Sequence, residues 1–184
     1  MHPGRHLFVL LGIALCLACS GQQSIRQDLP SEQEAWVNSA CTPVSPDFSA
    51  WTRRQVGSVT IAIPPGYIAE QGPPTNIGIR GPARRSTIVV AIHNQQEAQR
   101  SFDASYDRQR QYRHVCRTTL SGYTADVIGG YDRGQYFLVA RWQVEWKGGD
   151  EGKSLVASIS GTRLEEVIEL RAVIHTIRPV ESND

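Results

Sequence analysis

The stretch 116-CRTTLSGYTADVIGGYDRGQYFLVARWQVEW-146 decides the fold that the sequence predicts. From Tyr136 to Trp146 every second residue is apolar, and polar residues such as Arg141 alternate with this row. Strict alternation is typical of a strand in a sheet that has one buried face. Residues 131–134 (YDRG) form a turn that joins this strand to an earlier one at 123–127. We therefore expect an antiparallel hairpin at the centre of the domain.

The segments around this hairpin predict further strands and three helices. The predicted strands cover residues 56–63, 87–93, 123–127, 136–146 and 155–159, with a short edge strand at Ile77 and Ile79. Residues 87–93 (TIVVAIH) are apolar on both faces, which indicates a central strand covered on both sides. Three capping-box pairs predict helices. Ser31–Glu34 indicates a helical turn through Trp36 and Val37, and Asn94–Glu97 indicates a surface helix after residue 94. Thr162–Glu165 indicates a closing helix over 164–174.

This order of elements predicts the α+β class, as an α-β-α sandwich with a mainly antiparallel sheet. The strand end at 64–67 (PPGY), the meander with Gly122 and Trp142, and the closing segment 169–178 (ELRAVIHTIR) resemble the PsbP-like superfamily. That superfamily includes photosystem extrinsic proteins, a Ran-binding nuclear-import protein and many small bacterial lipoproteins. The resemblance spans about residues 55–178. It implies an α-β-α sandwich used mainly for binding, and it supplies no shared catalytic residue.

The N-terminus carries the pattern of a secretory signal peptide over residues 1–18. Arg5 is its positive residue, and residues 7–18 are apolar over a length too short to span a bilayer as a helix. Cys19 follows 16-CLA-18, which resembles the bacterial lipobox except that Cys16 stands where leucine is usual. We expect lipidation of Cys19; the alternative is ordinary cleavage that releases a soluble secreted protein.

The residues after Cys19 predict a tether at 19–35 and a single globular domain at 36–184. Residues 20–35 are polar and lack periodicity, as in a segment that holds a domain away from its membrane. Ser20 resembles the residues that permit export onward to the outer membrane. We therefore expect a lipid-anchored protein of the bacterial cell envelope, at the outer membrane and facing the periplasm.

The charge balance argues against a nucleic-acid partner. The full chain has 19 Lys and Arg against 18 Asp and Glu. Removing the signal peptide removes Arg5 and leaves 18 of each, so the mature chain is formally neutral. Phosphate-dominated binding requires a basic excess that this chain does not have.

Cys41 and Cys116 remain once the cysteines of the N-terminal segment are set aside. In an oxidising compartment we expect them to form a disulfide bond. A free reactive thiol is the alternative, and no flanking sequence supports it.

The sequence shows no motif for catalysis, metal binding or a cofactor. His93, His114 and His175 lie far apart and form no HxH, HExxH or CxxC spacing, so only convergence in the fold would build a metal site from them. There is no G-x-S-x-G elbow. The candidate acid–base pairs Asp103–Asp107 and Glu165–Glu166 each have an adequate structural explanation. We expect neither a metal site nor a cofactor.

Arginines and tyrosines gather between residues 97 and 117, a stretch with two more basic than acidic residues. Tyr106, Arg110 and Arg113 are the candidate partner-binding surface, since arginine and tyrosine are enriched at interfaces. A solvated helix face crossed by internal ion pairs is the alternative interpretation. The sequence thus favours a non-catalytic, membrane-tethered binding or assembly module of the bacterial envelope, without identifying its ligand. The alternative is a small envelope hydrolase whose catalytic residues meet only in the fold, with His93 or His114 beside a carboxylate in a deep pocket.

Overall fold

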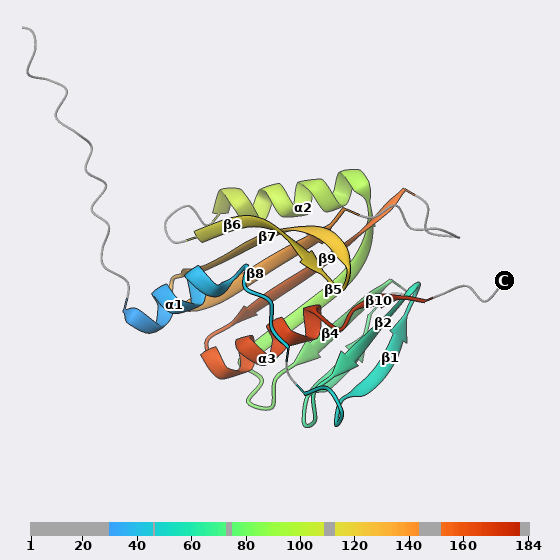
Figure 1. Ribbon diagram of the computed structural model, residues 1–184, viewed down its shortest axis with the longest axis horizontal. Helices are drawn as coiled ribbons and strands as arrows, with labels where there is room; N and C mark the ends of the chain where they lie inside the picture. Colours follow the sequence, from blue (N-terminus) through green and yellow to red (C-terminus); the bar gives the residue numbers. More distant parts are fainter. Residues whose placement is uncertain (1–29, 46, 73–74, 109–112, 144–151, 181–184) are drawn as a thin grey trace, which may run out of the picture.

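The computed structural model describes residues 30–45, 47–72, 75–108, 113–143 and 152–180. A seven-stranded antiparallel sheet forms the middle layer (Figure 1). Helix α2 (Gln95–Arg108) packs on one face, and α1 (Ser31–Ser39) and α3 (Leu164–Ile174) pack on the other. This arrangement confirms the predicted α+β class. In the ranges described, no helix has the length and apolar character needed to cross a membrane.

The main sheet places a late strand of the chain at its centre. Its order is β3-β4-β5-β9-β8-β7-β6, so β9 pairs with β5 on one side and with β8 on the other. The strands are β3 (Ile68–Gln71), β4 (Asn76–Arg80), β5 (Ser86–Asn94), β6 (Arg113–Leu120), β7 (Tyr123–Asp132), β8 (Gln135–Trp142) and β9 (Lys153–Gly161).

Strand β8 has two buried faces, where the alternating pattern predicted one. Its predicted apolar row, from Tyr136 to Trp142, lies in the main core with residues of α1 and α3. Phe137 and Val139 point the other way and are also buried, in a second cluster with Ala98 and Phe102 of α2. The prediction was wrong because α2 covers the second face. Residues 144 and 146 of the predicted row lie outside the described residues.

The strand predicted over residues 56–63 is instead a hairpin. It consists of β1 (Thr52–Val56) and β2 (Val59–Ile63), and Val56 pairs directly with Val59. Gly57 adopts φ 56°, which a tight two-residue turn requires and glycine tolerates. Strand β10 (Arg178–Pro179) also pairs with β2. The strands β1, β2 and β10 form a small sheet that is separate from the main sheet.

The two edge strands of the main sheet, β3 and β6, were not predicted. The edge strand predicted at Ile77 and Ile79 corresponds to β4, and both residues are buried. β4 is not at the edge of the sheet, because β3 pairs with it on that side and forms the edge. β6 has no continuous apolar row that would reveal it. Its turn into β7, at Ser121 and Gly122 with φ 57° and 89°, is the signal that the sequence offered.

The central position predicted for residues 87–93 is confirmed, because β5 lies between β4 and β9. Ile88, Val90 and Ile92 are buried on the face of the main core. Ala91 is buried on the other face, but Val89 is 43% exposed there. The cover on that face is therefore partial, because α2 reaches only one end of β5.

One of the three predicted helix caps is present. Asn94 Oδ1 accepts a hydrogen bond from the Glu97 backbone N–H at 2.8 Å, which caps α2. The caps predicted at Ser31 and Thr162 are wrong: α1 begins after Pro30 and α3 after Arg163, and neither start has a side-chain cap hydrogen bond. α1 is also longer than the predicted single turn, and it begins inside the stretch expected to be a tether.

Contacts of α1 fix the N-terminal part of the domain against β7 and α3. The indole Nε1 of Trp36 donates to the carbonyl of Gly130 at 2.9 Å, in a buried position. Arg171 of α3 donates through Nη1 to the carbonyl of Ser39 at 2.8 Å. Ala40 lies so close to β7 that a Cβ added at Gly129 would overlap its own Cβ. Glycine at 129 is therefore what allows α1 to approach the sheet.

Candidate functional site

A cleft of about 690 Å³ opens where the first half of α2 meets the end of β8 and the start of β9. Most of the residues that line it are glutamines and arginines: Gln95, Gln96, Gln99, Arg100, Arg141, Trp142, Gln143 and Ser154. The cap at Asn94 starts α2 directly after β5, which brings the three glutamines to the cleft. Trp142 is 1% exposed with its ring in the core, and its carbonyl accepts a hydrogen bond from Ser154 Oγ at 3.0 Å.

A row of charges crosses three strands beside this cleft. Asp126 of β7 pairs in register with Arg117 of β6 and with Arg141 of β8. Its carboxylate lies 2.9 Å from Arg117 Nε and 2.8 Å from Arg141 Nη2, and Gln143 Nε2 donates to it at 2.6 Å. Burial raises the pKa of Asp126, but the hydrogen bonds from Arg141, Arg117 and Gln143 outweigh burial and hold its pKa below the usual value.

Arg141 is held in place yet keeps one donor unused. Its Nη1 donates to Gln99 Oε1 of α2, and its guanidinium carbon lies 5.3 Å from the ring centroid of Phe102. Its Nε is buried and has no hydrogen-bond partner within the described ranges. The side chain therefore joins α2 to the sheet at the cleft.

The cleft's chemistry suits binding. Its described lining residues offer amide donors and acceptors, two guanidinium groups and one hydroxyl that is already donated to Trp142. Neither a histidine nor a carboxylate is among them. The sequence indicated Arg141 and Gln143 only as residues opposite the apolar row, and it gave no sign of the cleft, because the glutamines reach it through the packing of α2.

The described histidines are not among the residues that line the cleft, although His93 pairs in register with the lining residue Ser154. His93 Nδ1 is 3.9 Å from Glu97 Oε2, and both side chains are partly exposed. Burial, followed by the charges of Arg171 and Arg178, lowers the pKa of His175 to about 4. Neither His93 nor His114, the two histidines that the hydrolase hypothesis needs, is among the residues that line the cleft.

The predicted acid–base pairs have structural contacts. Asp103 Oδ1 accepts a hydrogen bond from Gln99 Nε2 at 2.7 Å on the surface of α2. Glu166 is buried, and its Oε1 accepts from the backbone N–H of Ala83 at 2.8 Å. Nothing is described of the side chain of Asp107. Glu166 thus holds the loop between β4 and β5 against α3.

Two of the three residues of the predicted partner-binding surface meet. The guanidinium of Arg113 stacks 3.7 Å from the ring centroid of Tyr106 and donates to the Tyr106 carbonyl. Tyr106 is 42% exposed. Arg110 and the predicted lipidation residue Cys19 lie outside the described residues.

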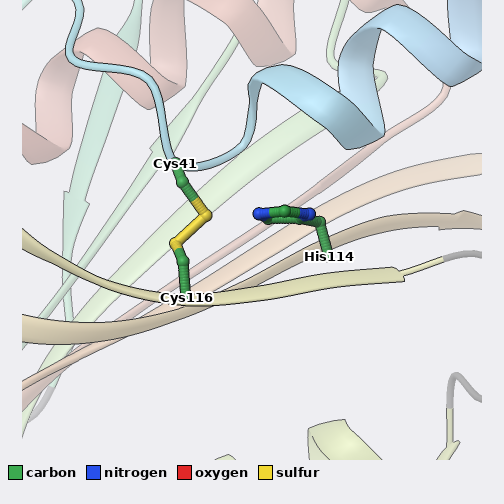
Figure 2. A group of neighbouring side chains, drawn as sticks. All are labelled: Cys41, His114 and Cys116. Atoms are coloured by element: carbon green, nitrogen blue, oxygen red, sulfur yellow. A yellow bond between two sulfur atoms is a disulfide. The ribbon is translucent and has the colours of Figure 1, made fainter.

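The structure also brings together a group that sequence spacing did not reveal. The disulfide expected between Cys41 and Cys116 is present, with Cα atoms 6.2 Å apart, and His114 lies beside it (Figure 2). One ligand atom from each of these three residues lies within 4.8 Å of the others. Cys41 and Cys116 are 75 residues apart, so no short motif could indicate the group.

The comparisons with known proteins give distant structural matches. No family model and no curated protein match the chain. Solved structures do match the chain, and three of them each have a TM-score of 0.44. They are a Bacteroides thetaiotaomicron protein (10% identity, 69% of this chain), the Saccharomyces cerevisiae Ran-binding protein Mog1p (13%, 72%) and LpqN, involved in cell envelope biogenesis of Mycobacterium tuberculosis (17%, 70%).

These matches cover very different shares of the other proteins. The chain spans 97% of Mog1p and 91% of LpqN, but only 47% of the length of the Bacteroides protein. The sequence identities to these proteins are low. No residue role passes from them to this chain.

Proposed function

We propose that this chain is a membrane-tethered binding module of the bacterial envelope and that the cleft between α2 and the ends of β8 and β9 is its binding site. The observation that carries this proposal is the lining of that cleft. It combines three exposed glutamines of α2 with Gln143 and with the guanidinium groups of Arg100 and Arg141. Such a surface provides hydrogen-bonding groups and no catalytic pair among its described residues.

The charges at the cleft favour a polar ligand with an anionic oxygen group. Arg100 and Arg141 line the cleft, and the nearby carboxylate of Asp126 is already shared between Arg141 and Arg117. Guanidinium groups bind carboxylate and phosphate oxygens through paired N–H donors. The glutamine amides add both donors and acceptors for the remainder of the ligand.

The test of the cleft is recovery of bound molecules by the full-length protein. Affinity-purified protein from native membranes would be analysed by native mass spectrometry for retained small molecules. Changing Gln99 and Arg100 together to alanine should abolish retention, because both side chains are exposed and line the cleft. The matched control changes Arg53 and Arg54, which are exposed on β1 away from the cleft. Equal retention by both variants, or turnover of the bound molecule, would overturn the proposal.

The predicted surface of Tyr106 and Arg113 is a second candidate, for a protein partner. An exposed tyrosine ring stacked with a guanidinium is the kind of side-chain pair enriched at interfaces. Replacing both by alanine should reduce cross-linking to envelope proteins while the cleft still retains its ligand. Unchanged cross-linking would rule this surface out.

The anchor is the finer part of the proposal. The lipobox-like 16–19 segment supports lipidation of Cys19, and the polar residues after it support a tether at the outer membrane. Cys19→Ala should abolish labelling by a fatty-acid probe and move the protein from the membrane to the soluble fraction. Persistent labelling would mean that another residue anchors the chain.

A further inference from the structure

The group of Cys41, His114 and Cys116 has the composition of a soft-metal site. His114 and Cys116 are two residues apart on β6, so both side chains point to the same face of the sheet. Figure 2 shows the imidazole beside the two sulfur atoms, with Cys41 reaching down from the segment after α1. His114 is exposed and both cysteines are partly buried, so solvent reaches the group. Among the described residues, the imidazole of His114 makes no hydrogen bond or ion pair.

Contacts other than the disulfide hold the two chain segments together. On one side, Trp36 donates to Gly130, Arg171 donates to Ser39, and Ala40 packs against Gly129. On the other side, the ladder with β7 fixes β6: His114 pairs with Gly129, and Cys116 with Val127. Because Gly129 has no side chain, nothing from that position separates the imidazole from the segment that carries Cys41. Cleavage of the sulfur–sulfur bond would therefore leave both sulfurs facing each other beside His114.

Reduction turns this group into three metal ligands. A dithiol reductant of the thioredoxin type transfers two electrons and two protons to the disulfide, forms two thiols and becomes a disulfide itself. A metal ion then displaces the two thiol protons and binds two thiolates and one neutral imidazole nitrogen. With metal–sulfur bonds of about 2.3 Å in tetrahedral geometry, the sulfurs need a separation of about 3.8 Å. Small side-chain rotations from the present positions supply that separation.

We propose that the reduced protein binds one thiophilic d10 cation, Zn²⁺ or Cu⁺, through Cys41, His114 and Cys116, and that the disulfide is the metal-free form of the same site. A Cys₂His set leaves the fourth position of Zn²⁺ open and also suits three-coordinate Cu⁺. Oxidation and metal binding exclude each other, because each uses both sulfurs. This site is independent of the proposed cleft.

The test uses the full-length protein reduced with a phosphine, which is then removed without air. Co²⁺ serves as the spectroscopic probe for the Zn²⁺ site, and Cu⁺ is supplied from a chromophoric chelator in a separate arm. We expect one equivalent of Co²⁺ with a thiolate charge-transfer band, displaced by Zn²⁺, and no binding by the oxidised protein. The relative affinities in the two arms identify the preferred ion.

Two variants separate this site from adventitious binding. His114→Ala should weaken the metal affinity by at least about tenfold, since loss of even an outer-shell partner commonly costs 10- to 100-fold. His93→Ala, which changes a histidine on β5, should leave the affinity unchanged. Circular dichroism of the reduced wild type shows whether the fold persists. Unfolding on reduction, equal metal binding by the oxidised protein, or equal affinity in His114→Ala would each overturn the proposal.

Discussion

Gly129→Ala tests whether close approach of α1 to the sheet stabilises this fold. A Cβ at position 129 would lie closer than 3.0 Å to the Cβ of Ala40, a separation that Cβ atoms in proteins essentially never show. It would also lie 3.5 Å from the Ala40 Cα. Overpacking of this kind costs about 1–3 kcal/mol. Replacing a strand glycine by alanine returns about 0.5–1 kcal/mol of backbone entropy. The net expectation is a loss of about 0.5–2 kcal/mol in the free energy of unfolding.

A double-mutant cycle isolates the contact. Ala40→Gly alone removes a buried methyl group and should cost about 1 kcal/mol. Combined with Gly129→Ala it removes the overlap, so the double variant should be about 1–3 kcal/mol more stable than the sum of the single effects predicts. Urea denaturation measures this as a shift of the midpoint at constant slope.

Gly78→Ala is the matched control for the same substitution. Gly78 also lies inside a strand, but a Cβ there would meet only the Glu70 carbonyl oxygen, at 3.9 Å. This variant should be neutral or more stable by about 0.5–1 kcal/mol. If Gly129→Ala behaves like Gly78→Ala, or if the cycle is additive, α1 does not press on the sheet as described.

Four other measurements test separate parts of the structure. Trp142→Ala should lower the free energy of unfolding by about 3–5 kcal/mol in chemical denaturation, since its ring is fully buried. Reducing the Cys41–Cys116 bond should cost about 4.5 kcal/mol in the chain-entropy model for its loop, measured by the same method. The lowered pKa of Asp126 adds stability above pH 3.8 that is lost as the pH falls through the folded-state pKa; Asp126→Asn should lack this acid-dependent loss. Because the pKa of His175 is lowered, the free energy of unfolding of the wild type should decrease as the pH falls from 6.5 to about 4. His175→Gln should flatten the dependence of stability on pH in this range.

The sequence allowed prediction of the elements that are rich in apolar residues, whether these alternate or form a continuous run. The central position of β5, the apolar row from Tyr136 to Trp142 and the closing helix α3 all follow from such patterns. The edge strand β6 could not be predicted from such a pattern, because a strand with few buried residues shows no apolar row. The split at Gly57 was missed because Val56, the last residue of β1, fits the start of the alternating strand, and the rest of β1 is polar.

The sites were less predictable than the fold because each depends on contacts between distant segments. The disulfide could be expected, since two cysteines remained and the compartment was oxidising. The position of His114 beside the disulfide could not be predicted, because it depends on the approach of α1 to β7. The cleft was equally hidden: Gln99 and Arg141 meet only when α2 packs on the second face of β8, which the alternating pattern had suggested was exposed.

The position of β9 has a consequence for how the chain folds as it is made. β3, β4 and β5 form one half of the main sheet, β6, β7 and β8 form the other, and β9 is the strand of that sheet that pairs with both. Until β9 (Lys153–Gly161) is available, β5 and β8 each present an unpaired edge of apolar strand to solvent. Such edges are where partly folded chains associate. A chain that stops before Lys153 should therefore aggregate as two open half-sheets, because the segment that begins with β9 completes the domain.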